Sequence, residues 1–545
     1  MKKSLHSIWD SVSTAFKGLC LVALIFGFST QLATAQSRII KGSVTESTDS
    51  EPVLGASILI KGTATGTVTD LDGQFELVVP SNESILVVSF IGFQSQEIVV
   101  GNRSTVNVVL DYSSEELSEV VVTALGVERE VKALGYSVQA VDGDKFTEAR
   151  ETNVMNSLSG RVAGVQITNS SSGVGGSTRV TIRGESSLNI NANQPLFVVD
   201  GVPISNNIVG SSGSGNQPVD YGNPAGEINP DDIASMTILK GPAAAALYGS
   251  RAANGAILIT TKTGKNKKGL GISINSNTTF DTPLKLPDWQ DRYGQGNNGQ
   301  FAFVNGAGAG NADGVDESWG PALDQGAMIP QFDSPRDVAG FRGGDLNAPA
   351  GSTITPTPWV SNPNNIRDFF QTGVTLSNNV AISSGNEKSN FRFSWTNLDQ
   401  KGTVPNTDLM RNTIAFSGRT QLNDRLTVNT SINYQKSTSE NRPSISYGTE
   451  SLMYLWIWYG RQINTNNLRN YWMPGMEGRQ QYNYNYNYHD NPYFNVYENT
   501  NGQSKDRVFG NVMANYKFTD KLNLMVRTGL DLYNDLRDRK RAFST

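Results

Sequence analysis

The strongest constraint on the fold is a strict alternation of apolar and polar residues late in the chain. In residues 426–434, LTVNTSINY, one set of alternate residues is Leu, Val, Thr, Ile and Tyr, and the other is Thr, Asn, Ser and Asn. Residues 522–532 repeat the pattern, as do Phe391, Phe393 and Trp395. Successive side chains of a β-strand point to opposite faces, so the pattern predicts strands with one apolar and one polar face. Transmembrane β-barrels have this pattern, with apolar side chains toward lipid.

The alternation predicts seven barrel strands, at residues 272–280, 374–384, 389–399, 411–422, 425–436, 507–518 and 522–533. After the first strand, the connections run long, short, medium, short, long and short. Such barrels place short turns in the periplasm and long loops outside, so we expect residues 281–373 and 437–506 to face the medium. These loops are rich in aromatic and amide residues. Such residues suit stacking on sugars or gripping a partner, and an aromatic belt at the membrane interface is the alternative.

The N-terminus is typical of a secretory signal peptide. Two lysines follow Met1, residues 19–28 form an apolar run, and an Ala-Thr-Ala sequence ends at Ala35. A membrane-spanning helix needs about 20 apolar residues, so an anchor is the weaker interpretation. We expect cleavage between Ala35 and Gln36, because small residues occupy both specificity positions. The single cysteine, Cys20, lies within this segment, so we expect neither a disulfide nor a lipid anchor in the mature chain.

Composition argues against enzymatic chemistry and against a nucleic-acid partner. His6 lies in the predicted signal, which leaves His489 as the one histidine of the mature chain. Zinc sites and nucleophilic triads need several positioned ligands or bases, so we predict no catalytic residue, no metal site and no cofactor. We expect His489 to be an exposed loop imidazole among the tyrosines of residues 481–490. A net charge of -5 disfavours phosphate binding. Residues 294–299, GQGNNG, match a dinucleotide motif by letter only, without its strand and helix.

The first part of the mature chain, residues 36–111, is predicted to form a series of short β-strands. Segments such as FELVVP and SILVVSFIGF favour strands, and Asp72-Gly73 predicts a hairpin turn. The pattern is similar to the carboxypeptidase-regulatory-like β-sandwich. No histidine or metal-binding cluster accompanies it, so we interpret the unit as a structural or docking module.

Four motifs follow in order between residues 116 and 264. They are ELSEVVVTALGVERE at 116–130, IRGESS at 182–187, PLFVVDGVPI at 195–204 and MTILKGPAAAALYGSRAANGAILITTKTG at 236–264. Their sequence and order closely resemble the plug region of TonB-dependent outer-membrane transporters, specifically the SusC/RagA family. The last motif joins two strands through a small-residue turn and supplies no catalytic side chain.

The resemblance implies two sets of site residues. The TonB box, a segment that adds as a strand to the TonB protein, comprises Leu117, Ser118, Glu119, Val120, Val121, Val122, Thr123 and Ala124. The plug motif comprises Arg183, Gly184, Asp200, Gly201, Lys240, Tyr248, Gly249, Arg251, Asn254 and Gly255. One more strand of the preceding sandwich is the alternative for the box. Arg183 and Arg251 would either contact the barrel wall or substrate, or fix plug loops through hydrogen bonds, the role we favour because a buried arginine must be paired.

The predicted fold is mainly β, with five parts. They are a signal peptide (1–35), a carboxypeptidase-regulatory-like β-sandwich (36–111), an acidic linker with the TonB box (112–126), an α/β plug domain (127–264) and a partial antiparallel outer-membrane β-barrel (265–545). Within the plug we expect a helix at residues 147–158. Seven strands cannot close the 22-stranded barrel of such transporters, so we expect an N-terminal portion of a longer protein, one that does not insert alone as a stable monomer.

The resemblance implies TonB-dependent active import of a nutrient, a glycan or peptide oligomer, through the outer membrane of a Gram-negative, Bacteroidetes-type cell. Expected partners are TonB with its inner-membrane energising complex, a SusD-like lipoprotein and outer-membrane lipid. The N-terminal domains would be periplasmic. A surface receptor or adhesin that binds ligand without transport is the alternative. An exported peptidase is disfavoured by the histidine and cysteine counts.

Overall fold

The computed structural model describes residues 38–111, 120–122, 128–130, 137–301 and 317–545, except 64, 91, 149, 171, 207–218, 265–268, 446 and 487. The predicted signal and its cleavage site at Ala35 and Gln36 lie outside the described residues. The chain forms two compact units, Met1–Ser118 and Glu119–Thr545. Within the described ranges, no helix has both the length and the apolarity that a membrane crossing requires.

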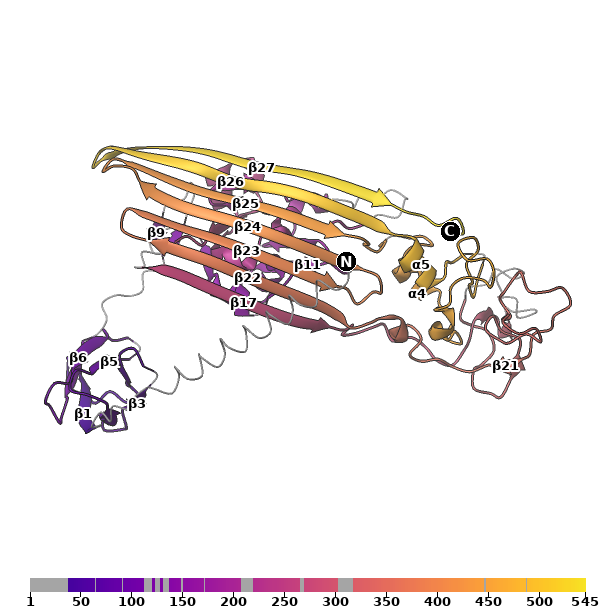
Figure 1. Cartoon of the computed structure of the whole chain (residues 1–545), viewed down its shortest axis with the longest axis horizontal. Coiled ribbons are helices and arrows are strands. Elements are labelled where there is room, and N and C mark those ends of the chain that lie inside the picture. The colour runs from indigo at the N-terminus through magenta and orange to yellow at the C-terminus, as the bar shows by residue number, and fades with distance from the viewer. Residues whose placement is uncertain are drawn as a thin grey trace, which may run out of the picture. The chain divides into compact units, whose positions relative to one another are not determined.

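The first unit is a β-sandwich (Figure 1). Its strands are Arg38–Glu46 (β1), Ser57–Ile60 (β2), Gly66–Val68 (β3), Gln74–Val79 (β4), Ile85–Ser89 (β5), Gln96–Val99 (β6) and Val108–Leu110 (β7). They form two sheets, ordered β4-β1-β7 and β3-β2-β5-β6. Alternate side chains of β4 are buried, as the period of two requires, and the two sheets share one apolar core that includes Ile40, Ile58 and Leu86.

The hairpin predicted at Asp72-Gly73 is wrong. The turn is present, because Gly73 N–H donates to Asp70 O at 3.0 Å and the Asp70 carboxylate accepts from Asp72 N–H at 3.0 Å. It joins β3 to β4, however, and these strands belong to different sheets. Local turn chemistry therefore predicted the reversal of the chain but not the strand that pairs across it.

In the second unit, Val120–Val122 forms the short strand β8, which pairs antiparallel with Glu128–Glu130 (β9). The other box residues, Leu117, Ser118, Glu119, Thr123 and Ala124, lie outside the described part of the chain.

The plug is a small α/β unit. Its strands are Val138–Asp142 (β10), Val165–Asn169 (β11), Thr178–Ile182 (β12), Leu196–Val199 (β13), Val202–Ile204 (β14), Ile233–Leu239 (β15) and Ala256–Thr261 (β16). Its helices are Asp144–Glu148 (α2), Val154–Leu158 (η3), Ile190–Asn193 (η4), Pro224–Glu227 (η5), Pro230–Asp232 (η6), Pro242–Tyr248 (α3) and Ser250–Ala252 (η7). Five strands form a sheet ordered β10-β15-β16-β13-β14, and β11 pairs with β12.

The single helix predicted at residues 147–158 is wrong. The chain forms the one-turn helix α2, which ends at Glu148, and then the separate 3-10 helix η3. Asn153 precedes η3 in an extended conformation, and its side chain accepts from Met155 N–H at 3.1 Å. An asparagine in this geometry starts a helix, so it interrupts a continuous one.

All seven predicted barrel strands are confirmed. They are Leu270–Asp281 (β17), Gly373–Gly385 (β22), Ser389–Lys401 (β23), Asp408–Gln421 (β24), Leu426–Ser439 (β25), Asn501–Thr519 (β26) and Leu522–Arg539 (β27). Each pairs antiparallel with the next, and the described structure gives the outer strands β17 and β27 one neighbour each (Figure 1). The largest errors are equal: β26 begins at Asn501 rather than at residue 507, and β27 ends at Arg539 rather than at residue 533.

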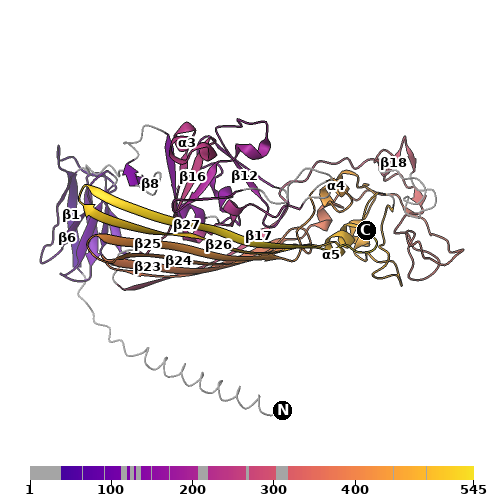
Figure 2. The ribbon, with the colours of Figure 1, turned by 90° about the horizontal axis from the view of Figure 1, so that it is seen from above.

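The predicted alternation of faces is also confirmed. In β25, Ile432 and Tyr434 are 45% and 38% exposed, whereas Ser431 and Asn433 are buried. The plug lies against the polar face (Figure 2), and Phe509 of β26 joins its apolar core. Most apolar side chains of the sheet thus face away from the plug, as lipid contact requires.

On the outward face, one row of cross-strand neighbours that is apolar on every strand is followed by one that is polar on every strand. One row is apolar or aromatic on every strand: Ile274, Val380, Trp395, Ile414, Tyr434, Val508 and Leu532. The next row toward the long loops is polar on every strand: Ser276, Asn378, Asn397, Asn412, Lys436, Asp506 and Asn534. Members of the polar row bond to one another, with Lys436 Nζ 2.7 Å from Asp506. Paired polar groups suit the edge of an apolar membrane belt.

The long loops are folded rather than open. They contain Gly296–Asn297 (β18), Gln300–Phe301 (β19), Met328–Ile329 (β20), Thr357–Pro358 (β21), Arg367–Phe369 (η8), Leu452–Ile457 (α4), Thr465–Leu468 (η9) and Pro492–Glu498 (α5). Phe369, Trp456, Tyr482 and Tyr484 are buried in a core of their own, which we call the loop core. Most of its aromatic side chains therefore hold the loops together rather than facing a ligand or lipid.

Candidate functional site

A cavity of about 350 Å³ lies between the plug and the inner wall of the sheet. Inward-facing wall residues that line it, including Thr375, Arg411 and Gln503, lie toward the strand ends that lead into the long loops. On the plug side it is lined by residues 150–153 and 173–178 among others. The volume falls within the range of small-ligand sites, so we call it the loop-side cavity and treat it as the candidate ligand site.

Arg442 connects the loop after β25 to the plug. Its side chain is buried, and Nη1 donates to the carbonyl oxygens of Val174 at 3.2 Å, Gly175 at 3.1 Å and Asp220 at 3.4 Å. Gly175 has a φ of 61°, and a Cβ there would lie 2.9 Å from the guanidinium. The approach therefore depends on a glycine. Burial, with the positive charge of Arg411, lowers the pKa of Arg442 to about 10.

Arg411 of β24 also lines the loop-side cavity. Its hydrogen bonds are long, from Nη1 to Thr152 O at 3.4 Å and from Nε to Ser437 Oγ at 3.4 Å. Neither Arg411 nor Arg442 forms an ion pair with a carboxylate of the described residues. Enclosed cations are costly unless paired, so these two guanidinium groups stand out from the other charged groups of the interface.

Three carboxylates line the cavity: Glu227, which is paired with wall cations, Glu151 of the plug, and Asp281 at the end of β17. Burial raises the pKa of Glu151, and the charge of Asp281 adds to the effect. β17 lies three strands away from β24 in the sheet, or about 14 Å at 4.8 Å per strand. The cavity lining therefore carries positive charge on the β24 side and negative charge on the β17 side.

The plug is joined to β23 by a buried ion pair. Asp232 Oδ1 accepts from Arg392 Nη1 at 2.6 Å and from Ser394 Oγ at 2.5 Å. Asn229 completes the contact, donating to Asp232 Oδ2 at 2.7 Å and to Thr396 Oγ1 at 2.8 Å. Every charged atom of this contact thus has a partner across or beside the interface, as burial requires.

A second charged contact joins the plug to β26. Glu227 accepts from Lys505 Nζ at 2.7 Å and from Arg507 Nη1 at 3.1 Å. Arg507 continues the network to β27, where its Nε lies 2.9 Å from Asp531 Oδ1, and it donates to Pro224 O at 2.8 Å. The Glu227 carboxylate is therefore already shared by two cations.

On the other side of these contacts, a second cavity of about 320 Å³ lies toward the short turns, lined by Tyr248, Arg419 and Arg527 among others. Asp200 lies at its edge, where it accepts from Thr261 Oγ1 at 2.7 Å and from Ser431 Oγ of β25 at 2.8 Å. The two charged contacts therefore lie between a loop-side and a turn-side cavity along the same wall.

The structure does not gather the predicted plug-motif residues into one site. Asp200 reaches the barrel wall, and Lys240 Nζ donates to Gln139 within the plug at 3.1 Å. Asn254 accepts from Ser186 Oγ at 2.8 Å, and so ties two plug loops together. The motif glycines Gly184, Gly201, Gly249 and Gly255 have φ values of 88°, 81°, 73° and 96°. These residues shape turns, in which glycine is favoured.

The preferred role for Arg183 and Arg251 is wrong in the described structure. Both side chains are exposed, and neither guanidinium forms a hydrogen bond or ion pair with a described residue. Arg183 instead has a φ of 60°, and its backbone N–H donates to Gly164 O at 2.8 Å. Arg183 therefore contributes to the motif through its backbone, which forms a turn, and not through a buried side chain.

The expectation of an exposed His489 is also wrong. The side chain is 5% exposed and lies against Tyr454 and Tyr484, at ring-centroid distances of 5.5 and 6.3 Å. The Tyr-Asn repeat around it contributes to the loop core, so polar composition alone did not reveal its burial.

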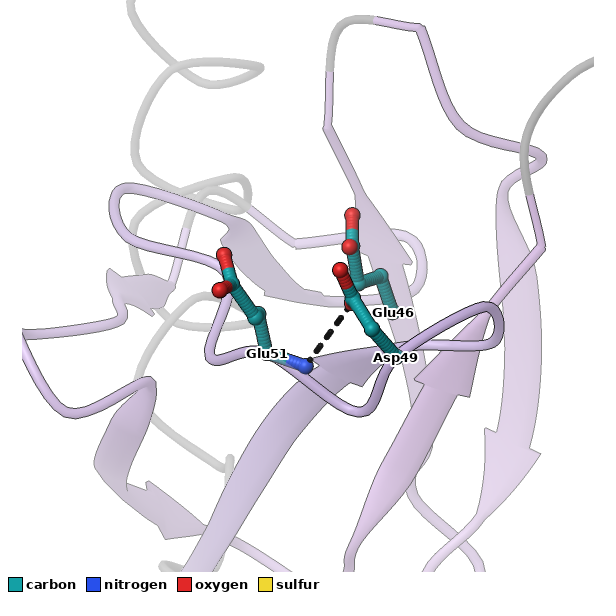
Figure 3. Close-up of side chains that lie close together, drawn as sticks. All are labelled: Glu46, Asp49 and Glu51. Carbon is teal, nitrogen blue, oxygen red and sulfur yellow. Dashed lines mark hydrogen bonds between the residues drawn. The ribbon is translucent and has the colours of Figure 1, made fainter.

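In the first unit, Glu46, Asp49 and Glu51 bring three carboxylates together, with ligand atoms within 4.8 Å of one another (Figure 3). Glu51 N–H donates to Asp49 Oδ1 at 3.2 Å. A hydrogen bond with Glu46 lowers the pKa of Asp49. Exposed acidic groups commonly gather without an ion, so we assign no metal site to this group.

The charged residues of the plug–wall interface were not predicted as site residues. They are Glu227, Asp231, Asp232, Arg392, Arg411, Arg442, Lys505 and Arg507. A charged residue on the polar face of a predicted strand is the signal that marks Arg392 and Arg411. No sequence pattern marks their plug partners.

Comparisons with known proteins agree with this architecture. The CarboxypepD_reg-like domain model matches residues 40–122, and the TonB-dependent Receptor Plug Domain model matches residues 130–256. TonB-dependent receptor SusC of Bacteroides thetaiotaomicron is 33% identical over 399 residues, which are 73% of this chain and 34% of that protein. TonB-dependent receptor P3 of Formosa agariphila is 29% identical over 508 residues, 92% of this chain and 42% of that protein. The chain thus spans less than half the length of these relatives.

Among solved structures, the RagAB peptide importer in the "open-open" state has a TM-score of 0.54 and 21% identity, over 78% of this chain and 43% of that chain. At this identity the likeness supports the fold. A plug domain seated on antiparallel barrel strands with an apolar outer face defines the class of TonB-dependent receptors. The chain belongs to the SusC/RagA family within that class.

Proposed function

We propose that the protein imports an oligomeric nutrient, a glycan or peptide, across the outer membrane, with the plug as the gate and TonB as the source of force. The polar character of the plug–wall interface carries the proposal. Asp232 and Glu227 meet cations of the wall, and Asp200 meets a wall hydroxyl. When the plug moves, water can replace such contacts, because a polar group that loses a protein partner can form a hydrogen bond to water instead.

In this proposal the ligand enters the loop-side cavity and contacts plug loops that Arg442 holds to the wall. TonB binds the box by strand addition, on an edge of β8 or in place of β9. Its pull separates the charged contacts, and the ligand passes to the turn-side cavity along the same wall. No step requires bond chemistry.

The relatives suggest the partners. The family resemblance implies a SusD-like lipoprotein that covers the outer loops and delivers the ligand, together with TonB and its energising complex. The family resemblance leaves glycans and peptides as the two substrate classes, and the structural neighbour RagAB is a peptide importer.

The test is uptake by cells that carry Val121→Pro. Proline removes a backbone donor from the box strand, so we expect uptake to fall to the level of cells treated with a proton uncoupler, while surface binding persists. Growth on single glycans and on protein hydrolysate measures uptake, and Ser113→Pro in the linker is the matched control. Unchanged uptake in Val121→Pro would overturn the box, and surface binding without any uptake that the uncoupler abolishes would favour a receptor that does not transport.

A further inference from the structure

The loop-side cavity is lined by two cations, Arg411 and Arg442, that form no ion pair with a carboxylate of the described residues. Arg411 lies on the polar face of β24, and Arg442 follows β25 by a few residues along the chain. The other inward cations nearby are paired: Arg392 with Asp232, and Arg507 with Glu227 and Asp531. Arg411 and Arg442 are therefore cations of the loop-side cavity that form no ion pair with a described carboxylate, and they offer donors to a ligand.

Glu227 does not neutralise them. Its charge acts on Arg411, but both of its oxygens already accept from Lys505 and Arg507. Asp220, whose charge acts on Arg442, accepts instead from Ser177 N–H at 2.8 Å and Gly222 N–H at 2.8 Å. The nearby carboxylates are therefore occupied by other donors.

The two arginines differ in how much of each guanidinium is in use. Arg442 Nη1 is engaged with three plug carbonyls, which gives this residue a structural role. Arg411 Nε donates to Ser437 Oγ at 3.4 Å and to the Gln435 side-chain oxygen at 3.3 Å, whereas Nη1 has only the long contact to Thr152 O at 3.4 Å. The two outer nitrogens of the guanidinium therefore remain available to an incoming group. A guanidinium fork matches the two oxygens of a carboxylate.

We infer that Arg411, supported by Arg442, forms a carboxylate-binding subsite in the loop-side cavity, and that the imported oligomer carries a carboxylate. The inference rests on the proposed function, because it names a chemical feature of the imported nutrient. Two sources share this chemistry: an oligopeptide, through its terminus or acidic side chains, and an acidic oligosaccharide. Glu151 and Asp281 face the same cavity, so selectivity comes from the local guanidinium rather than from net positive charge.

Two probe pairs separate the sources. One pair is a casein peptide pool and the same pool with its carboxylates amidated, and the other is oligogalacturonate and its methyl ester. Binding is measured on the purified protein in detergent. In at least one pair we expect the carboxylate form to bind roughly tenfold to hundredfold more tightly than its neutral form, as charge-assisted hydrogen bonds allow. The pair that shows the difference identifies the source.

Arg411→Gln should remove that preference, and Arg411→Lys should restore part of it. Arg419→Gln is the matched control, because Arg419 lies on the same strand and inward face but lines the turn-side cavity. Protease resistance of the plug confirms that each variant is folded. Equal binding of both forms in both pairs, binding of no probe, or a preference that survives Arg411→Gln would overturn the inference. TonB-dependent uptake of a neutral nutrient would also overturn it and would leave the proposed function in place.

Discussion

Asp232 of the plug and Arg392 of β23 form a buried ion pair, with 2.6 Å between Asp232 Oδ1 and Arg392 Nη1, although 160 residues separate them in the chain. A polar pair of this kind holds the plug in place without an apolar seal that would resist movement. The same argument applies to Glu227 and its two cations.

The first prediction concerns this pair. Arg392→Met should destabilise the seating of the plug by about 3–5 kcal/mol, because it leaves the Asp232 carboxylate buried without a cation. The measurement is the denaturant concentration at which plug peptides become protease-sensitive, with leakage of vancomycin into cells as a second readout. The double variant Asp232→Asn with Arg392→Met should cost less than the sum of the single variants. Strict additivity of the two changes would contradict a direct interaction.

Glu227 offers a test by rescue. Glu227→Gln should loosen the plug, because Lys505 then loses its carboxylate while Arg507 retains Asp531. Adding Lys505→Met should recover part of the lost stability, since it removes the uncompensated charge. The same protease assay reports both variants. No recovery in the double variant would show that the Glu227 contact is not governed by charge.

The loops should be sensitive to pH through Asp490. Burial raises the pKa of Asp490 from 3.8 to about 6, and the charge of Glu450 also raises it, while Gln481 and His489 oppose the change. A raised carboxyl pKa contributes stability that is fully present below the unfolded value and is lost as pH rises through about 6. The contribution is about 3 kcal/mol at 1.36 kcal/mol per pH unit.

Hydrogen exchange of the α5 amides should therefore be slower at pH 4.5 than at pH 7.5 after correction for intrinsic rates. Asp490→Asn should remove most of this difference and protect α5 at pH 7.5, because the amide oxygen still accepts from Gln481 Nε2, which lies 2.6 Å away. An unchanged pH dependence in Asp490→Asn would assign the effect to another group.

Asn491 should be among the most sensitive loop positions. Its side chain accepts from Tyr493 N–H at 2.8 Å at the start of α5, and donates to Leu468 O at 2.9 Å and Tyr482 O at 2.8 Å. Asn491→Ala should destabilise the loop core by at least about 2 kcal/mol, because it removes a helix cap and leaves buried carbonyls without a donor. Thermal unfolding followed by tryptophan fluorescence measures the loss. Asn466→Ala, at a more exposed position, is the control.

The sequence alone determined the architecture of the barrel sheet. Its period of two is a local property, since neighbouring side chains of a strand face opposite ways whatever they pair with. That is why all seven strands were predicted and why the faces of Ile432 and Ser431 were assigned correctly. Strand ends near the loops were less certain, because β26 begins with the polar residues Asn501 and Gln503 on its buried face.

Only the tertiary structure decided which groups meet across the interface. Arg392 and Arg411 have the same sequence signature, a charge on a polar strand face, yet one is paired with Asp232 and the other lies toward a cavity. The burial of His489 likewise depends on tyrosines that the loop fold brings around it. Such partners come from long-range packing and register, which residue type and spacing do not encode, whereas strand periodicity is encoded locally.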